Sequence, residues 1–428
     1  MSLDEDLEEA AAAGAGGEVH PGLRRARAWL TRVVEPGTVD FWRYVDDVGP
    51  VDAVRRLRAG TAPERIRSLV GARAGEDQSR EDLLRAARCD ARLVVPEDEE
   101  WPALPLHALT LAVGEEPADS RKQSDRTLAL VPPVGLWVRG PARLDELIDR
   151  SVAIVGSRAS TAYGEHVAAE LGHQLGERGW TVVSGGAYGI DAAAHRGALA
   201  AEAPTVAVLS CGVDRPYPAA HGALFHRIAE AGLLVSEWPP GCAPHRHRFL
   251  VRNRLIAALT RGTVVVEAAA RSGAQATAQR ARRLGRQVLV VPGPVTSAMS
   301  VGCHELLRDE GVGATLVTTA AQVIEAVGSI GADLADPPER PVTPRDGLSD
   351  LAVRVLDACP VRSGVSPERL AAVAGCDVLD VLRVLPALEL ADLVQWTGTG
   401  WRLAPPPPKQ RPAKGEVHRS GTATVSPE

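Results

Sequence analysis

Residues 152–158 read Val-Ala-Ile-Val-Gly-Ser-Arg, an apolar run that ends on a glycine, a serine and an arginine. The run is continuous, whereas a strand with one solvated face alternates apolar and polar residues, so it is typical of a parallel strand buried on both faces. Similar runs, separated by helical stretches, follow at 181–183, 205–209, 233–235, 263–266, 287–291 and 315–317. Repeated β-α-β units predict an α/β fold with a doubly wound, mainly parallel sheet, whose ligands bind beyond the carboxyl ends of the strands.

The composition limits the classes of protein to consider. The chain has 428 residues, of which 45% are hydrophobic and 24% charged, as in soluble globular proteins of several domains. No apolar stretch is long enough to span a bilayer, and the acidic N-terminus is the opposite of a secretory signal. The six cysteines include no Cys-x-x-Cys pair, which argues against a disulfide framework and a zinc site. We therefore expect a cytoplasmic protein without membrane contact, metal or cofactor.

Changes in pattern divide the chain into parts. Apolar residues recur with helical spacing around Leu23, Trp29 and Phe41, whereas the prolines and acids of 329–347 are typical of a linker. Two helices and a hairpin that turns at Gly398-Thr399-Gly400 predict a winged-helix-like domain after it. The expected parts are a disordered acidic N-terminus (1–20), a helical domain (22–71), the sheet domain (89–328), the linker (329–347), the winged-helix-like domain (348–404) and a disordered tail (405–428).

The turn after the first quoted strand is the first candidate for ligand binding. Gly156 lets the backbone approach a ligand closely, and Arg158 supplies a charge beside the polar Ser157. A helix that starts just beyond the turn would also offer free N–H groups to an anion. The alternative is an ordinary strand-to-helix turn with an arginine on the surface.

A second glycine-rich turn, Ser184-Gly185-Gly186-Ala187-Tyr188-Gly189, again lies between a strand and a helix. Three glycines in five residues are more than a tight turn requires, which favours a phosphate cradle. The turn is neither Gly-x-Gly-x-x-Gly nor a Walker A loop, so ATP hydrolysis is poorly supported. Asp191 and His195, one helical turn apart, resemble an acid–base pair, but a cap or a helix-face hydrogen bond is the favoured interpretation.

The most basic segment of the chain is 245–254, which holds four arginines and no acid although the net charge of the protein is −6. Arginine clamps phosphate, and an aromatic ring offers a platform for an unpaired base, so the segment predicts a nucleic-acid surface. A solvated helix start is the alternative. The residues expected to contact the ligand are Arg246, Phe249, Arg252, Asn253 and Arg254.

A third turn follows the strand at 263–266 and contains Arg271, Ser272 and Gly273. Ser272-Gly273 is expected to begin a helix and to present its N–H groups to an anion. The arginines of 280–286 form a further basic patch, for which a solvated helix face is an equal alternative.

Together these segments resemble the DNA-processing protein A family (DprA, also called Smf), whose motifs they follow in order and spacing over about 150–320. The resemblance implies a Rossmann-like sheet domain between a SAM- or helix-hairpin-helix-like domain and a winged-helix-like domain. The matching motifs are Ala153–Arg158, Ser184–Asp191, Gly212–Asp214, Tyr217-Pro218, Ser236-Glu237, Phe249, Arg252–Arg254, Val266-Glu267, Ser272-Gly273, Thr277-Ala278 and Val291–Gly293.

The resemblance implies a protein that binds single-stranded DNA and loads the RecA recombinase onto it, in DNA uptake, natural transformation and homologous recombination. Members of the family are not known for catalysis and typically dimerise through the Rossmann-like domain, so a non-enzymatic homodimer is expected. The implied DNA site comprises Gly156, Ser157, Arg158, Ser184, Gly185, Gly186, Gly189, Arg246, Phe249, Arg252, Asn253, Arg254, Ser272 and Gly273, with no catalytic or metal-binding residue.

The chain departs from the family pattern at a few positions. His221 and His304 stand where the family usually has asparagine, and Ser210 replaces a common glycine. The segment Ala274–Ala276 reads Ala-Gln-Ala where the family prefers Ser-Leu-Ile. These departures concern the details of the pocket and not the fold.

Two other functions have partial support in the sequence. Phosphoribohydrolases with a related fold use Pro-Gly-Gly-x-Gly-Thr-x-x-Glu, but here the place of the catalytic glutamate is taken by Arg280. A transcription factor acting through 348–404 is the third possibility. Its expected recognition helix, 378–390, carries Arg383 against two acids and includes Pro386, which should break or kink it. A regulatory or protein-contact role is therefore the expectation for this domain.

Overall fold

The computed structural model describes residues 3–12, 19–115, 129–329, 331, 333 and 345–405. The chain divides into two compact units, Met1–Asp336 and Pro337–Glu428. Apart from Pro405, the tail expected to be disordered lies outside the described residues, as does most of the expected linker.

The acidic N-terminus differs from the expectation of disorder, because α1 (Leu3–Ala12) is a helix packed on the first unit. Leu3 and Leu7 lie four residues apart, which places them on one helix face, and both are buried in an apolar cluster. The acidic face is used as well, since Asp4 accepts a hydrogen bond of 3.1 Å from Arg58. The prediction for 1–20 was therefore wrong over the residues of α1, because the acidic composition concealed this apolar pair.

The predicted helical region belongs to the same unit as the sheet. Its α2 packs on α1, α4 and α6. Arg24 of α2 donates hydrogen bonds to the carbonyl of Leu93 in the sheet and to Asp98, so charged contacts join the two regions. The elements are α2 (Pro21–Val33), α3 (Val39–Val48), α4 (Pro50–Arg58), α5 (Glu64–Val70), the 3-10 helix η1 (Gly71–Gly75) and α6 (Ser79–Arg88).

A nine-stranded sheet runs through the described residues of the first unit, in the order β1-β2-β6-β5-β4-β3-β7-β8-β9. All seven predicted runs are strands, and they pair in parallel; the antiparallel β1 and β2 at one edge were not predicted. The strands are β1 (Ala91–Val94), β2 (Leu136–Arg139), β3 (Ser151–Val155), β4 (Thr181–Ser184), β5 (Thr205–Val208), β6 (Leu233–Ser236), β7 (Gly262–Val265), β8 (Gln287–Val290) and β9 (Thr315–Leu316).

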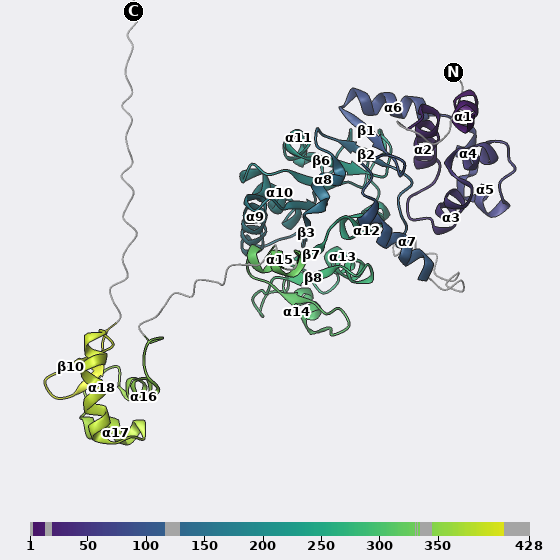
Figure 1. Ribbon diagram of the computed structural model, residues 1–428. Coiled ribbons are helices and arrows are strands. Elements are labelled where there is room, and N and C mark those ends of the chain that lie inside the picture. The colour runs from purple at the N-terminus through teal and green to yellow at the C-terminus, as the bar shows by residue number, and fades with distance from the viewer. Residues whose placement is uncertain are drawn as a thin grey trace, which may run out of the picture. The chain divides into compact units, whose positions relative to one another are not determined.

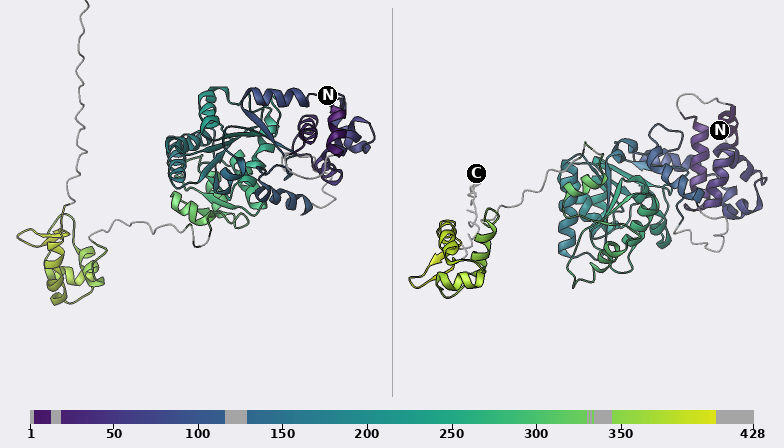
Figure 2. Two further views of the ribbon diagram at one scale, coloured as in Figure 1. Left: turned by 45° about the horizontal axis from the view of Figure 1, so that its top comes forward. Right: turned by 60° about the horizontal axis from the view of Figure 1, so that its bottom comes forward.

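Helices cover both faces of the sheet, as Figures 1 and 2 show. The strands are buried on both sides, which explains why their sequences are continuous apolar runs. One face carries α9 (Ala162–Glu177), α10 (Ile190–Ala200) and α15 (Ala320–Val327). The other carries α7 (Ala103–Glu115), α8 (Leu144–Asp149), α12 (Arg246–Leu259), α13 (Gly273–Arg283) and α14 (Val301–Arg308). On the first of these faces, α11 (Gly222–Ala231) lies beside α10 and packs on β5 and β6.

The strand order reverses at β3. From β3 the chain steps outward through β4 and β5 to β6, and then returns to place β7 on the other side of β3. In parallel sheets this reversal leaves a crevice at the carboxyl ends of the two strands, because their following loops diverge. The turns expected to bind a ligand follow β3, β4 and β7 and therefore meet at this edge.

The second unit has its own small core, which includes Val355, Leu370 and Leu385. Asp377 caps α18 as predicted, since its carboxylate accepts a hydrogen bond of 2.8 Å from the N–H of Leu379. The break expected at Pro386 does not occur, because α18 continues through it to Leu390. The ring of Pro386 is exposed, and the proline nitrogen cannot donate a hydrogen bond within the helix. The elements are α16 (Asp350–Ala358), α17 (Pro367–Ala374), α18 (Val378–Leu390) and the hairpin of β10 (Val394–Trp396) and β11 (Trp401–Leu403). The winged-helix assignment stays a prediction.

Candidate nucleic-acid interface

A cavity of about 750 Å³ opens at the crevice between β3 and β7. Its walls come from the turns after β3, β4 and β7, from the loop after β5, and from residues of α10, α12 and α13. Nine of the predicted site residues line it: Gly156, Ser157, Arg158, Arg246, Phe249, Arg252, Asn253, Ser272 and Gly273. The sequence motifs that were expected to act together are thus largely assembled in one place.

Exposed arginines surround this cavity. Arg158, Arg246 and Arg271 line it from three different segments, and none of them forms an ion pair with any described carboxylate. Elsewhere, arginines such as Arg24 and Arg92 are held by acids. Several guanidinium groups without ion pairs, on a protein of net charge −6, concentrate positive potential at the cavity, which favours a polyanionic ligand.

Aromatic side chains adjoin this charge. The guanidinium carbon of Arg158 lies 5.0 Å from the centroid of the Phe249 ring, within the range of a cation–π contact. The ring of Tyr217, from the loop after β5, makes an edge contact with Phe249 at a centroid distance of 5.9 Å. The cavity therefore offers apolar faces beside free positive charge.

Helical spacing explains which residues of α12 reach the cavity. Arg246, Phe249 and Asn253 lie at positions i, i+3 and i+7, so they share one face of the helix. Arg254 points elsewhere: both of its terminal nitrogens bond the carboxylate of Glu237, at 2.5 and 2.7 Å, and only 1% of its surface is exposed. The four arginines of the basic run thus do not form one surface, and the role of Arg254 is to pair with Glu237 inside the fold.

Arg252 lines the cavity, but it donates hydrogen bonds to backbone carbonyls of the protein. One terminal nitrogen donates to the carbonyls of Gly185, at 3.0 Å, and of Val208. Burial lowers the pKa of Arg252 to about 10, against the favourable charge of Asp191, so the group stays positive at neutral pH. Arg252 therefore supplies charge to the cavity and holds the glycine-rich turn in place.

The glycine-rich turn after β4 is bound mainly by its own neighbours. Asp191 accepts hydrogen bonds from the N–H groups of Gly185 and Ala187, at 3.2 and 3.3 Å. Burial raises the pKa of the Asp191 carboxyl above its ordinary value, although Arg252 and these N–H groups oppose the rise. Asp191 therefore holds the turn in place and does not cap α10, because the N-cap of that helix is Gly189. Of the predicted residues in this turn, Ser184, Gly185, Gly186 and Gly189 do not line the cavity.

The turn after β3 is tied to β7 by Glu267. Its carbonyl accepts a hydrogen bond from Ser157 N–H at 2.7 Å, and its carboxylate accepts from the backbone and the hydroxyl of Thr161. Glu267 is 1% exposed and does not line the cavity, so it is a structural bridge between two of the ligand-binding turns.

The N-terminus of α13 faces the cavity through Ser272 and Gly273. The Ser272 hydroxyl accepts a hydrogen bond from the N–H of Gln275 at 3.4 Å, as a helix cap does. The first N–H groups of a helix have no partner within it and carry partial positive charge, so this end adds to the attraction for an anion. Arg280, further along α13, is buried and donates to the carbonyl of Ala276.

The two histidines that depart from the family pattern both contact glycine carbonyls. A ring nitrogen of His221 lies 3.1 Å from the carbonyl oxygen of Gly186, and one of His304 lies 3.0 Å from that of Gly293. A histidine N–H can donate the same bond that an asparagine amide would donate. Each histidine can therefore supply a donor to its turn.

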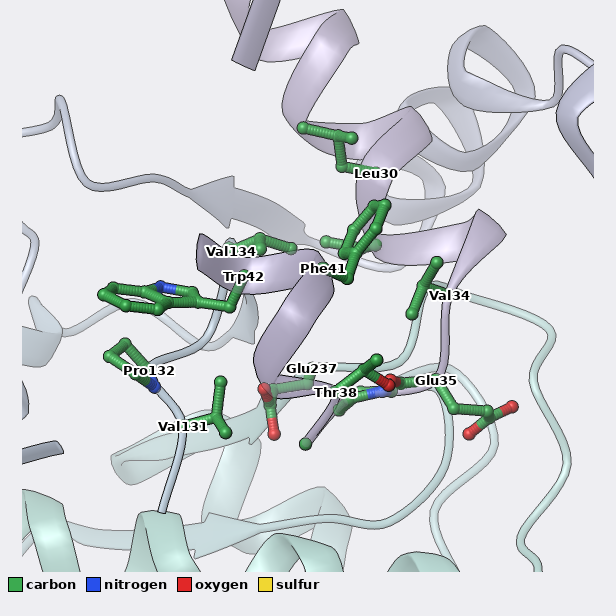
Figure 3. Close-up of a pocket in the computed structure, with 14 residues that line it drawn as sticks. Leu30, Val34, Glu35, Thr38, Phe41, Trp42, Val131, Pro132, Val134 and Glu237 are labelled. Carbon is green, nitrogen blue, oxygen red and sulfur yellow. The ribbon is translucent and has the colours of Figure 1, made fainter. Parts of the chain in front are cut away.

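Two smaller pockets lie beside α2. The first, of about 30 Å³, has mainly apolar walls that include Leu30, Phe41 and Trp42, as Figure 3 shows; it has room for little more than a water molecule. The second, of about 210 Å³, contains charged residues, of which Arg32 pairs with Asp82 and Glu35 with Arg248. Neither pocket brings several exposed arginines together, as the cavity at β3 and β7 does.

Glu35, at the edge of these pockets, connects the N-terminal helices to α12. It accepts hydrogen bonds from Arg248 of α12 and from the Trp238 indole, both at 3.1 Å. Burial opposes ionisation of the carboxyl, but the bonds from Arg248 and Trp238 prevail and hold the pKa of Glu35 below its usual value. The first turns of α12, which carry Arg246 and Phe249, are thus anchored from outside the sheet.

Sequence reasoning did not include several residues of the cavity. Tyr217 and Arg271 lie in recognised motifs or basic patches but were not assigned to the site. Nothing in the sequence pattern around Leu250 and Met299 indicated that these two residues bind a ligand. No group of three or more metal-ligating side chains occurs among the described residues. In the same part of the chain, no helix combines the length and the apolar character that crossing a membrane requires.

The model of one protein family, described as DNA recombination-mediator protein A, matches residues 93–328. The chain belongs to this family. A DprA relative from Mycobacterium tuberculosis is 47% identical over 395 residues, which cover 92% of this chain and 98% of the relative.

Two solved structures of the family match the chain. That of DNA processing protein A from Streptococcus pneumoniae has a TM-score of 0.56 and 27% identity, covering 71% of this chain and 96% of that one. The DNA processing protein A of Helicobacter pylori, whose structure was described for its single-stranded DNA binding mode, has 31% identity and a TM-score of 0.41 over 45% of this chain and 86% of that one. The match to the Streptococcus structure supports the Rossmann-like sheet derived above.

Proposed function

We propose that this DprA-family chain binds single-stranded DNA in the cavity between β3 and β7 and acts in DNA recombination. One observation carries the proposal: Arg158, Arg246 and Arg271 reach the cavity without acidic partners, and Phe249 lies among them. Phosphates would bind these guanidinium groups and the N-terminus of α13, whereas a base would stack on Phe249.

The remaining predicted residues fall into three groups: those that contact the strand, those that act indirectly, and one that has no part in binding. Gly156, Ser157 and Asn253 lie in the wall, where backbone and amide groups can bind the sugar–phosphate chain. Ser184, Gly185, Gly186 and Gly189 act indirectly, by forming the turn that Arg252 and Asp191 hold. Arg254 is left out, because its donors are taken by Glu237.

A single strand suits this cavity better than a duplex. Aromatic platforms can bind only bases whose faces are free, and in a duplex these faces are stacked on each other. A recessed aromatic ring such as Phe249, which is partly buried, is out of reach of a rigid double helix. We therefore expect preference for single strands with little dependence on sequence.

Loading of RecA onto the bound strand, in DNA uptake, natural transformation or recombination, is the family's role and our proposal for this chain. A homodimer formed through the sheet domain is proposed on the same ground, as is a cytoplasmic location, where such DNA is handled. A pull-down of RecA by the purified chain, with and without DNA, tests the contact with RecA. Sedimentation of the purified chain tests the homodimer.

We propose a non-catalytic role. A phosphoribohydrolase would need a carboxylate where Arg280 stands, and Arg280 is buried. The carboxylate in the cavity wall, Asp191, is engaged by two N–H groups of the glycine-rich turn. Release of free base from nucleoside monophosphates by the purified protein would contradict this proposal.

The binding proposal is tested by fluorescence anisotropy with one labelled oligonucleotide, presented as a single strand and as a duplex. We expect tight binding of the single strand and weak binding of the duplex. Arg158→Ala should weaken single-strand binding and reduce the slope of log affinity against log salt by about 0.7, because one phosphate contact is lost.

Arg143→Ala is the matched control for that experiment. Arg143 is exposed and precedes α8, at the opposite end of β3 from the cavity, where it pairs with Asp145. Its removal changes the net charge equally but should leave the affinity and the salt slope unchanged. Equal effects of the two variants would reject the cavity as the binding site.

A further inference from the structure

Tyr217 is an aromatic residue of the cavity wall that the predicted DNA contacts did not include. It lies in the loop after β5, and 47% of its surface is exposed. Its ring meets that of Phe249 at a centroid distance of 5.9 Å and an interplanar angle of 61°. Such an edge contact occupies at most one face of the tyrosine ring, so the other face is available.

The loop that carries Tyr217 does not need the ring in order to hold its shape. The carboxylate of Asp214 accepts the N–H of Gly241 at 2.9 and 3.0 Å, and the Cys211 thiol donates to the carbonyl of Arg215 at 3.4 Å. Within the described part of the chain, the Tyr217 hydroxyl forms no hydrogen bond. A purely structural role therefore leaves the exposure of this ring unexplained.

The neighbours of Tyr217 indicate what the ring could bind. Arg158 lies over Phe249, and Tyr217 adjoins Phe249, so a cation and two rings are adjacent along the wall of one cavity. The guanidinium of Arg158 already uses part of the Phe249 ring, whereas Tyr217 is the more exposed of the two aromatics. Stacking on bases is tolerant of sequence, because every base has a π-face.

We infer that Tyr217 is a second base-stacking platform, so that the cavity holds two neighbouring nucleotides of a single strand, one base on Phe249 and the next on Tyr217. This inference rests on the proposed binding of single-stranded DNA and assigns a further residue to that site. The phosphate between the two nucleotides would then lie near the arginines of the wall.

The first test compares Tyr217→Leu with Tyr217→Phe by anisotropy, using a labelled oligothymidylate. Leucine keeps bulk but removes the π-face, and we expect its affinity to fall by about five- to a hundredfold. Phenylalanine keeps the ring, and since the hydroxyl has no partner, this variant should bind like the wild type. Circular dichroism and thermal melting verify that both variants are folded.

The second test uses the unmodified protein, and so does not depend on a variant that folds. Oligonucleotides carrying one 5-iododeoxyuridine are irradiated in the complex, because this base cross-links to aromatic side chains on which it stacks. We expect mass spectrometry to find cross-links at both Tyr217 and Phe249. Cross-links at Phe249 alone would overturn the inference.

The outcomes separate this inference from the function on which it rests. If the wild-type protein does not bind the oligonucleotide, the proposed function itself fails. If it binds, and Arg158→Ala weakens binding while Tyr217→Leu does not, the second platform is rejected and the binding function stands.

Discussion

The guanidinium carbon of Arg158, in the turn after β3, lies 5.0 Å from the centroid of the ring of Phe249, in the first turn of α12. The two residues come from distant parts of the sequence, yet they form a charged group and an apolar face in direct contact at one cavity. A nucleotide presents the complementary pair, a phosphate and a planar base. This contact is therefore the centre of the proposed site.

Because Arg158 and Phe249 are in contact, their contributions to DNA affinity should not be additive. We expect each alanine variant to lose about 1–2 kcal/mol of binding free energy, and the double variant to differ from the sum by about 0.5–1 kcal/mol. Anisotropy titrations of the four proteins form the double-mutant cycle. Additive losses would show that the two residues act on separate parts of the strand.

Two glycines of the predicted site should respond differently to alanine. Gly186 has φ +67°, and a Cβ there would overlap the ring of Phe225, so Gly186→Ala should lower the free energy of unfolding by about 1–3 kcal/mol. Gly273, at the start of α13, has open space around its Cα. Gly273→Ala should leave stability unchanged or raise it by up to about 1 kcal/mol. Urea unfolding of both variants measures the difference, and a similar loss in both would contradict the argument.

The buried pair of Arg254 and Glu237 allows a test of whether Arg254 contacts DNA. Arg254→Met leaves an uncompensated carboxylate and should lower the free energy of unfolding by about 3–5 kcal/mol. The double variant with Glu237→Leu should recover most of the loss, because no buried charge remains. If Arg254 has no direct contact with DNA, the folded double variant keeps the wild-type affinity for single strands; a loss as large as that of Arg158→Ala would restore Arg254 to the site.

His195 links stability to pH through a fully buried ring. Thr205 donates its hydroxyl hydrogen to the carbonyl of Val182, so His195 Nδ1 must be the donor in its 2.8 Å contact with Thr205. The other ring nitrogen, Nε2, has no partner among the described residues. Burial, aided by the charge of Arg252, lowers the pKa of His195 from 6.5 to about 3. Because the folded pKa is the lower one, stability is fully present above pH 6.5 and is lost as the pH falls toward 3.

We therefore expect His195 to lower the free energy of unfolding by about 1.4 kcal/mol for each pH unit below 6.5. The variant His195→Gln should be less stable at pH 7.5, but its stability should fall less between pH 7.5 and 5. Urea unfolding at the two pH values gives the comparison, and the exposed His226 provides the control His226→Gln, which should keep the wild-type pH dependence. An equal pH dependence in His195→Gln would refute the assignment.

Local patterns predicted the parallel part of the sheet well. The seven runs that became strands are buried on both faces, so hydrophobicity alone marked them. The antiparallel strands β1 and β2 were missed because they lie in a region whose pattern was not resolved into separate elements. The helix α1 was missed because acidic composition outweighed one apolar pair, Leu3 and Leu7, which is buried only by contact with other helices.

The sequence by itself determined the doubly wound sheet, the turns that bear Gly156, Gly185 and Ser272, and the segment that carries Phe249, because each depends on residues close together in the chain. Only the tertiary structure decided which arginines are free to bind. Arg246 and Arg254 are alike in sequence, but one faces the cavity and the other meets Glu237, which follows a different strand. The partner of a charge is set by the packing of distant elements, and a neutralised, buried charge does not attract DNA.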